Sequence, residues 1–172
     1  MRTRVLGATL AMALLGVGCG KSGGEQGQSA ASQGAPAAQT AAAQPAGAGS
    51  PQGQAVFQRV CATCHQINAQ GLPGAFPPLA GSPFANGPAE RMIRIVLNGL
   101  MGPVEVKGQR FNNVMPPWKT LSDAEISAVL TYVRSNFGNT ASAVTPQLVA
   151  QIRAATASRA AMWTVAELEQ QH

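Results

Sequence analysis

The sequence predicts an all-α domain of short helices joined by loops that are rich in proline and glycine. Apolar side chains recur at helical spacing in successive stretches after residue 53, and capping residues mark where several stretches begin. Many of the 19 glycines and 12 prolines fall between these stretches. Seven of the eight aromatic residues lie between Phe57 and Phe137, so we expect that part of the 172-residue chain to hold the core.

Residues 1–18 have the composition of a signal peptide for export. Arg2 and Arg4 supply the positive start, and an apolar run of eleven residues follows, shorter than the ~20 residues that span a bilayer. Small residues then precede Cys19, which resembles a bacterial lipoprotein signal and implies lipidation of that cysteine. An ordinary secretory leader with an incidental cysteine is the alternative. We expect an exported, periplasmic protein that is lipid-anchored to a membrane. The resemblance to lipoproteins, with Gly20 after the cysteine, implies the outer membrane rather than the inner one.

Residues 19–52 form a low-complexity segment. After Cys19 the segment uses only Gly, Ala, Ser, Gln and Pro, with three exceptions. Such a chain cannot bury enough apolar surface to offset the entropy of ordering. We therefore expect a disordered tether between the leader and the folded domain.

Three helices are expected in the middle of the chain. The first covers residues 54–62, where apolar side chains share one face. The second has Pro88 at its first helical position and ends near Gly99. The third begins with a capping box at Ser122 and stops at Gly138.

The last segment, residues 139–172, is expected to be a helical extension. Thr145 and the proline after it begin one helix, and Thr164 begins another capping box, flanked by Trp163 and Leu168 at the positions of a hydrophobic staple. Isolated short helices are marginal in water. We therefore expect the extension to pack on the preceding domain.

The most informative motif consists of Cys61, Cys64 and His65. Two thiols three positions apart, followed directly by an imidazole, suit a short helical turn. In such a turn both sulfurs can form thioethers with the vinyl groups of one haem, while the histidine reaches the iron. The motif therefore predicts one covalently bound haem c, with Cys61 and Cys64 as its attachment sites.

Two other uses of paired cysteines compete with haem attachment. A thioredoxin-like redox pair would follow a strand in a βαβ pattern, whereas a helix-like segment, residues 54–60, leads into this motif. A zinc site would need further ligands, and the only other histidine is the terminal His172. Covalent haem is the interpretation we prefer.

The ligand on the other face of the iron decides between electron transfer and activation of a substrate. The methionines that follow the motif are Met92, Met101, Met115 and Met162. Met92 falls inside a helical pattern and suits the core, whereas Met115 is followed by two prolines that fix the backbone after it. We predict His65 and Met115 as axial ligands. A thioether and an imidazole saturate the iron, which favours electron transfer over catalysis.

On these residues the chain resembles the mono-haem class I cytochromes c over residues 51–138. The matching features are Gly53-x-x-x-Phe57, the haem motif, Pro77-Pro78-Leu79-x-Gly81, the Met115-Pro116 loop and a closing helix. The resemblance implies the cytochrome c fold, in which short helices and loops wrap one covalent haem. It also implies that the closing helix crosses the first, with Phe57 against Tyr132, and that the carbonyl of Pro77 accepts a hydrogen bond from His65.

Within this family the chain looks closest to the periplasmic branch found as cytochrome subunits of dehydrogenases or joined to copper nitrite reductases. That similarity rests on Asn98-Gly99-Leu100 and on Gly108-x-x-Phe111-Asn112-Asn113.

The predicted organisation is a signal peptide (1–18), a tether (19–52), a haem domain (53–138) and an extension (139–172).

We expect a one-electron carrier of a bacterial respiratory chain rather than an enzyme, with a dehydrogenase, reductase or terminal oxidase as partner. A haem subunit of a periplasmic dehydrogenase or reductase complex, and a haem enzyme or gas sensor with an open iron site, are the alternatives. From Cys19 onward there are ten basic and seven acidic residues, which does not indicate nucleic-acid binding, and no small-molecule substrate is expected.

Overall fold

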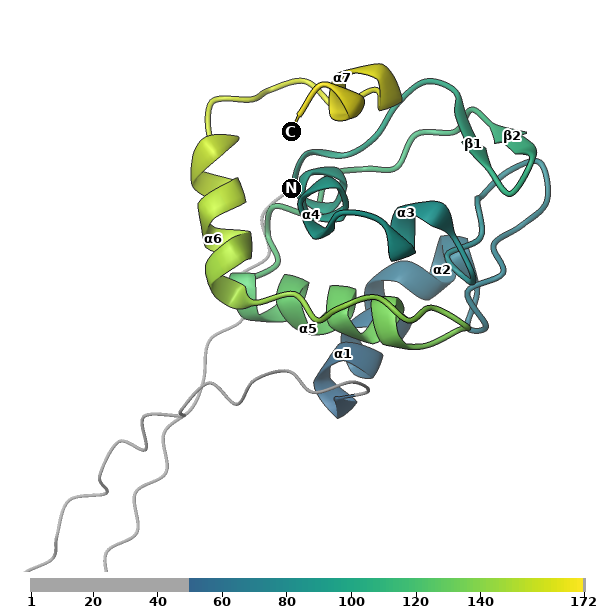
Figure 1. Cartoon of the computed structure of the whole chain (residues 1–172), viewed down its shortest axis with the longest axis horizontal. Coiled ribbons are helices and arrows are strands. Elements are labelled where there is room, and N and C mark those ends of the chain that lie inside the picture. The colour runs from purple at the N-terminus through teal and green to yellow at the C-terminus, as the bar shows by residue number, and fades with distance from the viewer. Residues whose placement is uncertain (1–49, 172) are drawn as a thin grey trace, which may run out of the picture. The chain divides into compact units, whose positions relative to one another are not determined.

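The computed structural model describes residues 50–171, which form short α-helices, one π-helical turn and a two-stranded hairpin (Figure 1). The elements are α1 (Pro51–Val56), η1 (Phe57–Cys61), α2 (Ala62–His65), α3 (Pro83–Asn86), α4 (Ala89–Asn98), β1 (Val104–Val106), β2 (Gln109–Phe111), α5 (Asp123–Ser135), α6 (Pro146–Ala155) and α7 (Val165–Glu169). The predominance of helix confirms the predicted fold class.

The predicted leader at residues 1–18, the predicted lipidation site Cys19 and the predicted tether up to residue 49 lie outside the described residues. Among residues 50–171, none of the helices combines the length and the apolar character that a membrane crossing requires.

The first helix begins earlier than its apolar pattern indicates. The hydroxyl oxygen of Ser50 accepts a hydrogen bond from the backbone N–H of Gly53 (3.2 Å), and Pro51 occupies the first turn, where its missing N–H costs nothing. The last two residues assigned to the tether therefore belong to α1. The helix continues through η1, whose wider turn lets the N–H of Ala62 bond the carbonyl of Phe57, and then into α2.

Helix α5 packs across α1, as the resemblance implies. The rings of Phe57 and Tyr132 lie 5.7 Å apart between centroids, which confirms the predicted contact, and Phe137 joins them at 5.1 Å from Phe57. The close approach depends on Gly53, because a Cβ at this position would lie 2.8 Å from the Cβ of Tyr132 and would collide with the carbonyl oxygen of Ala128.

Helix α4 differs from its prediction at its first residue. Pro88 is the N-cap rather than the first helical residue, because its ψ of 132° is extended and helical dihedrals begin at Ala89. The predicted end is confirmed, since Gly99 follows the last residue of α4 with a φ of +81°. The short helix α3 was not predicted, although Ser82 and Pro83 carry the capping signal of a helix start.

The hairpin of β1 and β2 lies in a region predicted as loop. Val104 pairs with Phe111 and Val106 with Gln109 in an antiparallel register. Lys107 and Gly108 both have positive φ, 55° and 75°, as a two-residue hairpin turn requires. The apolar side chains of the hairpin face a second, smaller core.

The extension contributes to both cores. Val149 and Ile152 of α6 join the main core with residues of α1, α4 and α5. The capping box predicted at Thr164 is present at the start of α7, and its staple residues Trp163 and Leu168 are buried in the second core. The segment after α5 thus packs on the helices that precede it (Figure 1).

Candidate functional site

An apolar cavity opens beside α2, α4 and α5. Its walls combine aliphatic side chains such as Leu130 and Val133 with two prolines, 77 and 78, and the ring of Trp118. The cavity and its open mouth together enclose about 800 Å³ of space between protein atoms, open solvent included. An adjoining hollow shares part of this wall and extends it to Cys64 and Val114.

Cys61 and Cys64 stand at the edge of this space, and both side chains are partly buried. Burial raises the pKa of the Cys61 thiol to about 11, and the neighbouring Cys64 adds to the shift. A thioredoxin-like nucleophile would instead need a lowered pKa. The local environment therefore disfavours a redox-active thiol pair.

His65 closes α2 and lines the same cavity. Its Nδ1–H donates to the carbonyl oxygen of Pro77 (2.9 Å), the hydrogen bond that the resemblance implies. Burial lowers the pKa of His65, and the bond to Pro77 opposes that shift. The ring is therefore neutral near pH 7, with its proton on Nδ1, which leaves Nε2 free to bind a metal.

Gly71 brings Pro77 to the histidine. Its φ is +67°, and its N–H donates to the carbonyl of His65 (2.9 Å). A Cβ at this position would lie 2.7 Å from the carbonyl carbon and oxygen of Pro77. The loop then doubles back through two hydrogen bonds between Leu72 and Phe76. The histidine is thus oriented by a turn that only glycine permits.

Met115 reaches the cavity from a loop rather than from a helix. Its N–H donates to the carbonyl of Leu100 (2.9 Å), and its own carbonyl accepts from Leu100 N–H (3.0 Å). Trp118 N–H bonds the carbonyl of Val96 beyond the two prolines (2.8 Å), and Asn113 Nδ2 donates to the carbonyl of Ala75 (3.0 Å). The backbone on both sides of Met115 is therefore fixed.

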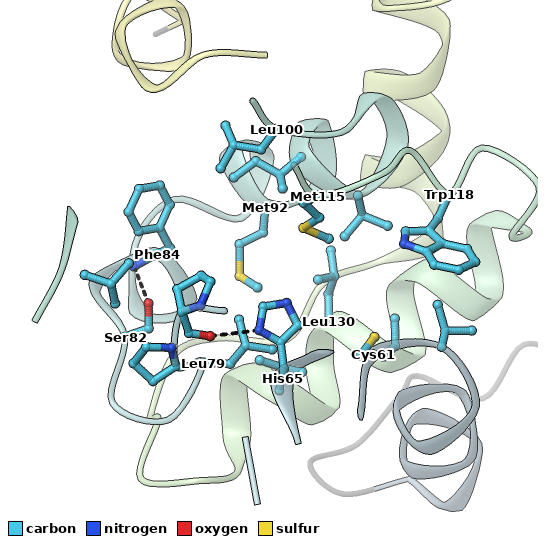
Figure 2. A pocket seen from close by; sticks show the side chains of 18 of the residues that line it. Cys61, His65, Leu79, Ser82, Phe84, Met92, Leu100, Met115, Trp118 and Leu130 are labelled. Carbon is cyan, nitrogen blue, oxygen red and sulfur yellow. Dashed lines mark hydrogen bonds between the residues drawn. The ribbon is translucent and has the colours of Figure 1, made fainter. Parts of the chain in front are cut away.

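The side chain of Met92 also lies against the cavity. Its helical pattern predicts a position in the core. Its side chain is 7% exposed and lines the cavity together with Met115. In Figure 2 the sulfur ends of both methionines and the ring of His65 project into the same space. The helical pattern correctly buries Met92, but it cannot tell a packed core from a cavity wall. Met101 and Met162 do not line the cavity.

The residues present fit a haem. Protein interiors are close-packed, so a cavity with an apolar lining suits an apolar occupant such as a macrocycle. The donor set also matches, because Cys61 and Cys64 stand at the edge, the neutral imidazole of His65 lies within, and thioether sulfurs line the wall.

Comparison with known proteins supports the same identification. The family model described as Cytochrome c matches residues 50–137. Cytochrome c-552 of Thermus thermophilus is 47% identical over 83 residues, which cover 46% of this chain and 63% of the relative. The chain thus spans less than two thirds of that relative.

Two dehydrogenase subunits are also similar. The cytochrome c subunit of the alcohol dehydrogenase (quinone) of Gluconobacter oxydans (strain 621H) is 32% identical over 92 residues, covering 52% of this chain and 19% of the relative. The fructose dehydrogenase cytochrome subunit of Gluconobacter japonicus is 31% identical over 111 residues, covering 59% of this chain and 22% of the relative. With one haem motif and the matching fold, the chain belongs to the cytochrome c family as a mono-haem class I cytochrome with covalently bound haem c.

Proposed function

We propose that the protein is a one-electron carrier in which Cys61 and Cys64 hold the haem while His65 and Met115 bind its iron. The observation that carries the proposal is that imidazole and thioether project into one apolar cavity with a cysteine at its edge (Figure 2). When bound, the haem supplies a reversible one-electron couple, and two protein ligands leave no position for a substrate.

The surrounding residues tune this couple. The Pro77 carbonyl fixes the tautomer and orientation of His65 and makes the imidazole a stronger donor. Aliphatic side chains and the ring of Trp118 make the wall of the cavity apolar. A thioether ligand and an apolar wall both favour a high reduction potential.

The experiment that tests the ligand set compares Met115→Ala with Met92→Ala, because both sulfurs line the cavity. We expect Met115→Ala to abolish the sulfur–iron charge-transfer band of the ferric protein, to lower the reduction potential and to allow rapid binding of carbon monoxide by the ferrous protein. Met92→Ala should retain the band. Loss of the band in Met92→Ala alone would exchange the two roles, and rapid carbon monoxide binding by the wild type would contradict ligation on both faces.

We place the protein in a bacterial respiratory chain, where it passes electrons between redox proteins such as a dehydrogenase, a reductase or a terminal oxidase. The names of two relatives favour a second arrangement, in which the protein is the cytochrome subunit of a dehydrogenase complex. Co-purification of a dehydrogenase in constant ratio after detergent extraction would support the complex, and a monomeric cytochrome would support the mobile carrier.

The proposed location is the periplasmic side of a membrane, through a lipid on Cys19 and export by residues 1–18. The segment that follows consists almost entirely of small and polar residues and would give the haem domain freedom to reach its partners. We expect Cys19→Ser to move the protein from the membrane fraction to the soluble fraction. A wild-type protein that is already soluble would contradict the anchor.

A further inference from the structure

The C-terminal extension reaches the backbone beside Met115 through the short segment 99–101. Residues 99–101 run between Met115 on one side and Trp163 on the other. Leu100 exchanges both backbone hydrogen bonds with Met115, at 2.9 and 3.0 Å. On the opposite side, Trp163 N–H donates to the carbonyl of Gly99 (3.0 Å) and its carbonyl accepts from Met101 N–H (2.8 Å). Three chain segments therefore form one continuous ladder.

The ladder is unusually close at Gly99. A Cβ at this position would lie 2.7 Å from the carbonyl oxygen of Met115 and 3.1 Å from the Cγ of Met162. Gly99 thus lies in close contact with the loop that carries Met115 on one side and with the extension on the other. A displacement of either neighbour changes the space available to the other.

The side chain of Trp163 is fixed within the extension. It is 5% exposed and packs with Leu100, Leu168 and the side chain of Met115 in the second core. The guanidinium of Arg159 stacks 3.6 Å above the indole ring, and the same group donates to Glu167 (2.8 Å). Trp163 is therefore presented to the ladder as a rigid group.

The extension also holds the chain after the methionine. Arg153 donates to the carbonyls of Lys119 (2.9 Å) and Leu121 (2.7 Å) and pairs with Asp123 (2.8 Å). The ammonium of Lys119 donates to the carbonyl of Arg159 (2.9 Å). Hydrogen bonds thus hold the loop that carries Met115 both beside the methionine and downstream of it.

From this arrangement we infer that Trp163 is a positioning residue for the methionine ligand, and that the extension keeps the Met115 sulfur on the iron. The inference rests on the proposed function, because it takes Met115 as the axial ligand. Surface loops with few contacts open locally at low cost, whereas this loop opens only if the ladder with residues 99–101 is broken or moves with it. The extension therefore controls how often the iron loses its thioether.

The test compares three variants of the full-length holoprotein. Trp163→Ala removes the buried indole, and Trp163→Phe keeps an apolar ring. The control is Val56→Ala, which removes a buried side chain of the main core that lies outside the extension, the ladder and the cavity. The rate of carbon monoxide binding to the ferrous protein measures detachment of the sulfur. We expect Trp163→Ala to raise this rate roughly tenfold or more, as expected when two backbone hydrogen bonds are weakened, to weaken the sulfur–iron band and to lower the reduction potential.

The control should lower the melting temperature without raising the carbon monoxide rate, and Trp163→Phe should restore most of the wild-type rate. Equal rates in Trp163→Ala and the control would overturn the inference while leaving the ligand assignment intact. If instead Met115→Ala keeps the sulfur–iron band, Met115 is not the ligand, and the proposed ligand set fails together with this inference.

Hydrogen exchange of the wild type supplies a test that does not depend on folding of a variant. The amides of Met115, Met101 and Trp163 should exchange through one common opening, with equal protection. Much faster exchange at Trp163 than at Met115 would show that the extension frays on its own, and would also overturn the inference.

Discussion

The two sides of the haem cavity are built in different ways. His65 lies in the same helical segment as Cys61 and Cys64, and its orienting hydrogen bond goes to Pro77, twelve residues later. Met115 lies on a loop, and its backbone partners come from segment 99–101, which in turn pairs with Trp163. The histidine side is thus organised by nearby sequence, and the methionine side by three segments far apart in the chain.

This difference predicts where the site can yield. Contacts between residues close in sequence cost little loop entropy, whereas a ladder of distant segments depends on the whole extension remaining docked. The histidine side should therefore stay intact under mild perturbation, and the methionine side should open first. Each of the following predictions breaks or sharpens this comparison.

The largest effect is expected when both sides lose their common anchor. The double variant Cys61→Ala/Cys64→Ala cannot retain the haem covalently. We expect it to lose most of its free energy of unfolding, which is about 5–15 kcal/mol for a typical domain. The reason is that the apolar cavity then loses the group that fills it. Circular dichroism should show no cooperative melting. Cys19→Ala, which removes the third cysteine, should keep both haem and melting, and cooperative melting of the haem-free double variant would refute the prediction.

On the histidine side, Gly71→Ala should cost about 4 kcal/mol of unfolding free energy, from the positive φ and from the clash with the backbone carbonyls of Phe76 and Pro77. Gly74→Ala is the matched control, since Gly74 has a similar φ of +74° with no atom near its Cβ position, and should cost about 1 kcal/mol. Denaturant melts measure both. Displacing Pro77 weakens the imidazole as a donor, so Gly71→Ala should raise the reduction potential and keep the sulfur–iron band.

On the methionine side, Gly99→Ala should cost about 3 kcal/mol, because its Cβ would crowd the carbonyl of Met115. Gly102→Ala, with a φ of +80° and open space, should cost about 1 kcal/mol. In contrast to Gly71→Ala, the Gly99→Ala variant should lower the reduction potential and weaken the sulfur–iron band. Potential shifts of the same sign in the two variants would remove the distinction between the two sides.

The smallest effect that we expect is a decline of the melting temperature at low pH. Hydrogen bonds from the Arg159 side chain, and then from Thr164, lower the pKa of Glu167 from 4.5 to about 2. A carboxylate whose pKa is lower in the folded state stabilises that state above its unfolded pKa, and the stabilisation is lost as the pH falls through the folded pKa. The melting temperature should therefore decline between about pH 4.5 and about 2. This decline should be smaller in Glu167→Gln, whereas Glu169→Gln, on the same helix but outside the capping box, should follow the wild type. An unchanged decline in Glu167→Gln would exclude this carboxylate as the cause.

The sequence determined the parts of this protein that depend on neighbours along the chain. The haem motif, the capping boxes at Ser122 and Thr164 and the glycine that ends α4 are local patterns with local physical causes, and the structure contains each of them. The contact between Phe57 and Tyr132 was also foreseen, from the order of features in the family.

Tertiary structure decided the rest. Helical periodicity buries Met92 without saying whether it faces a packed core or a cavity wall, because both environments are apolar. The hairpin depends on a two-residue turn in which Lys107 has a positive φ. Residues other than glycine rarely adopt this conformation, so the sequence predicts a loop in place of the two strands. The ladder from Trp163 through Leu100 to Met115 uses backbone groups alone. Since every residue except proline carries the same backbone donor and acceptor, no side-chain pattern could reveal which segments would meet there.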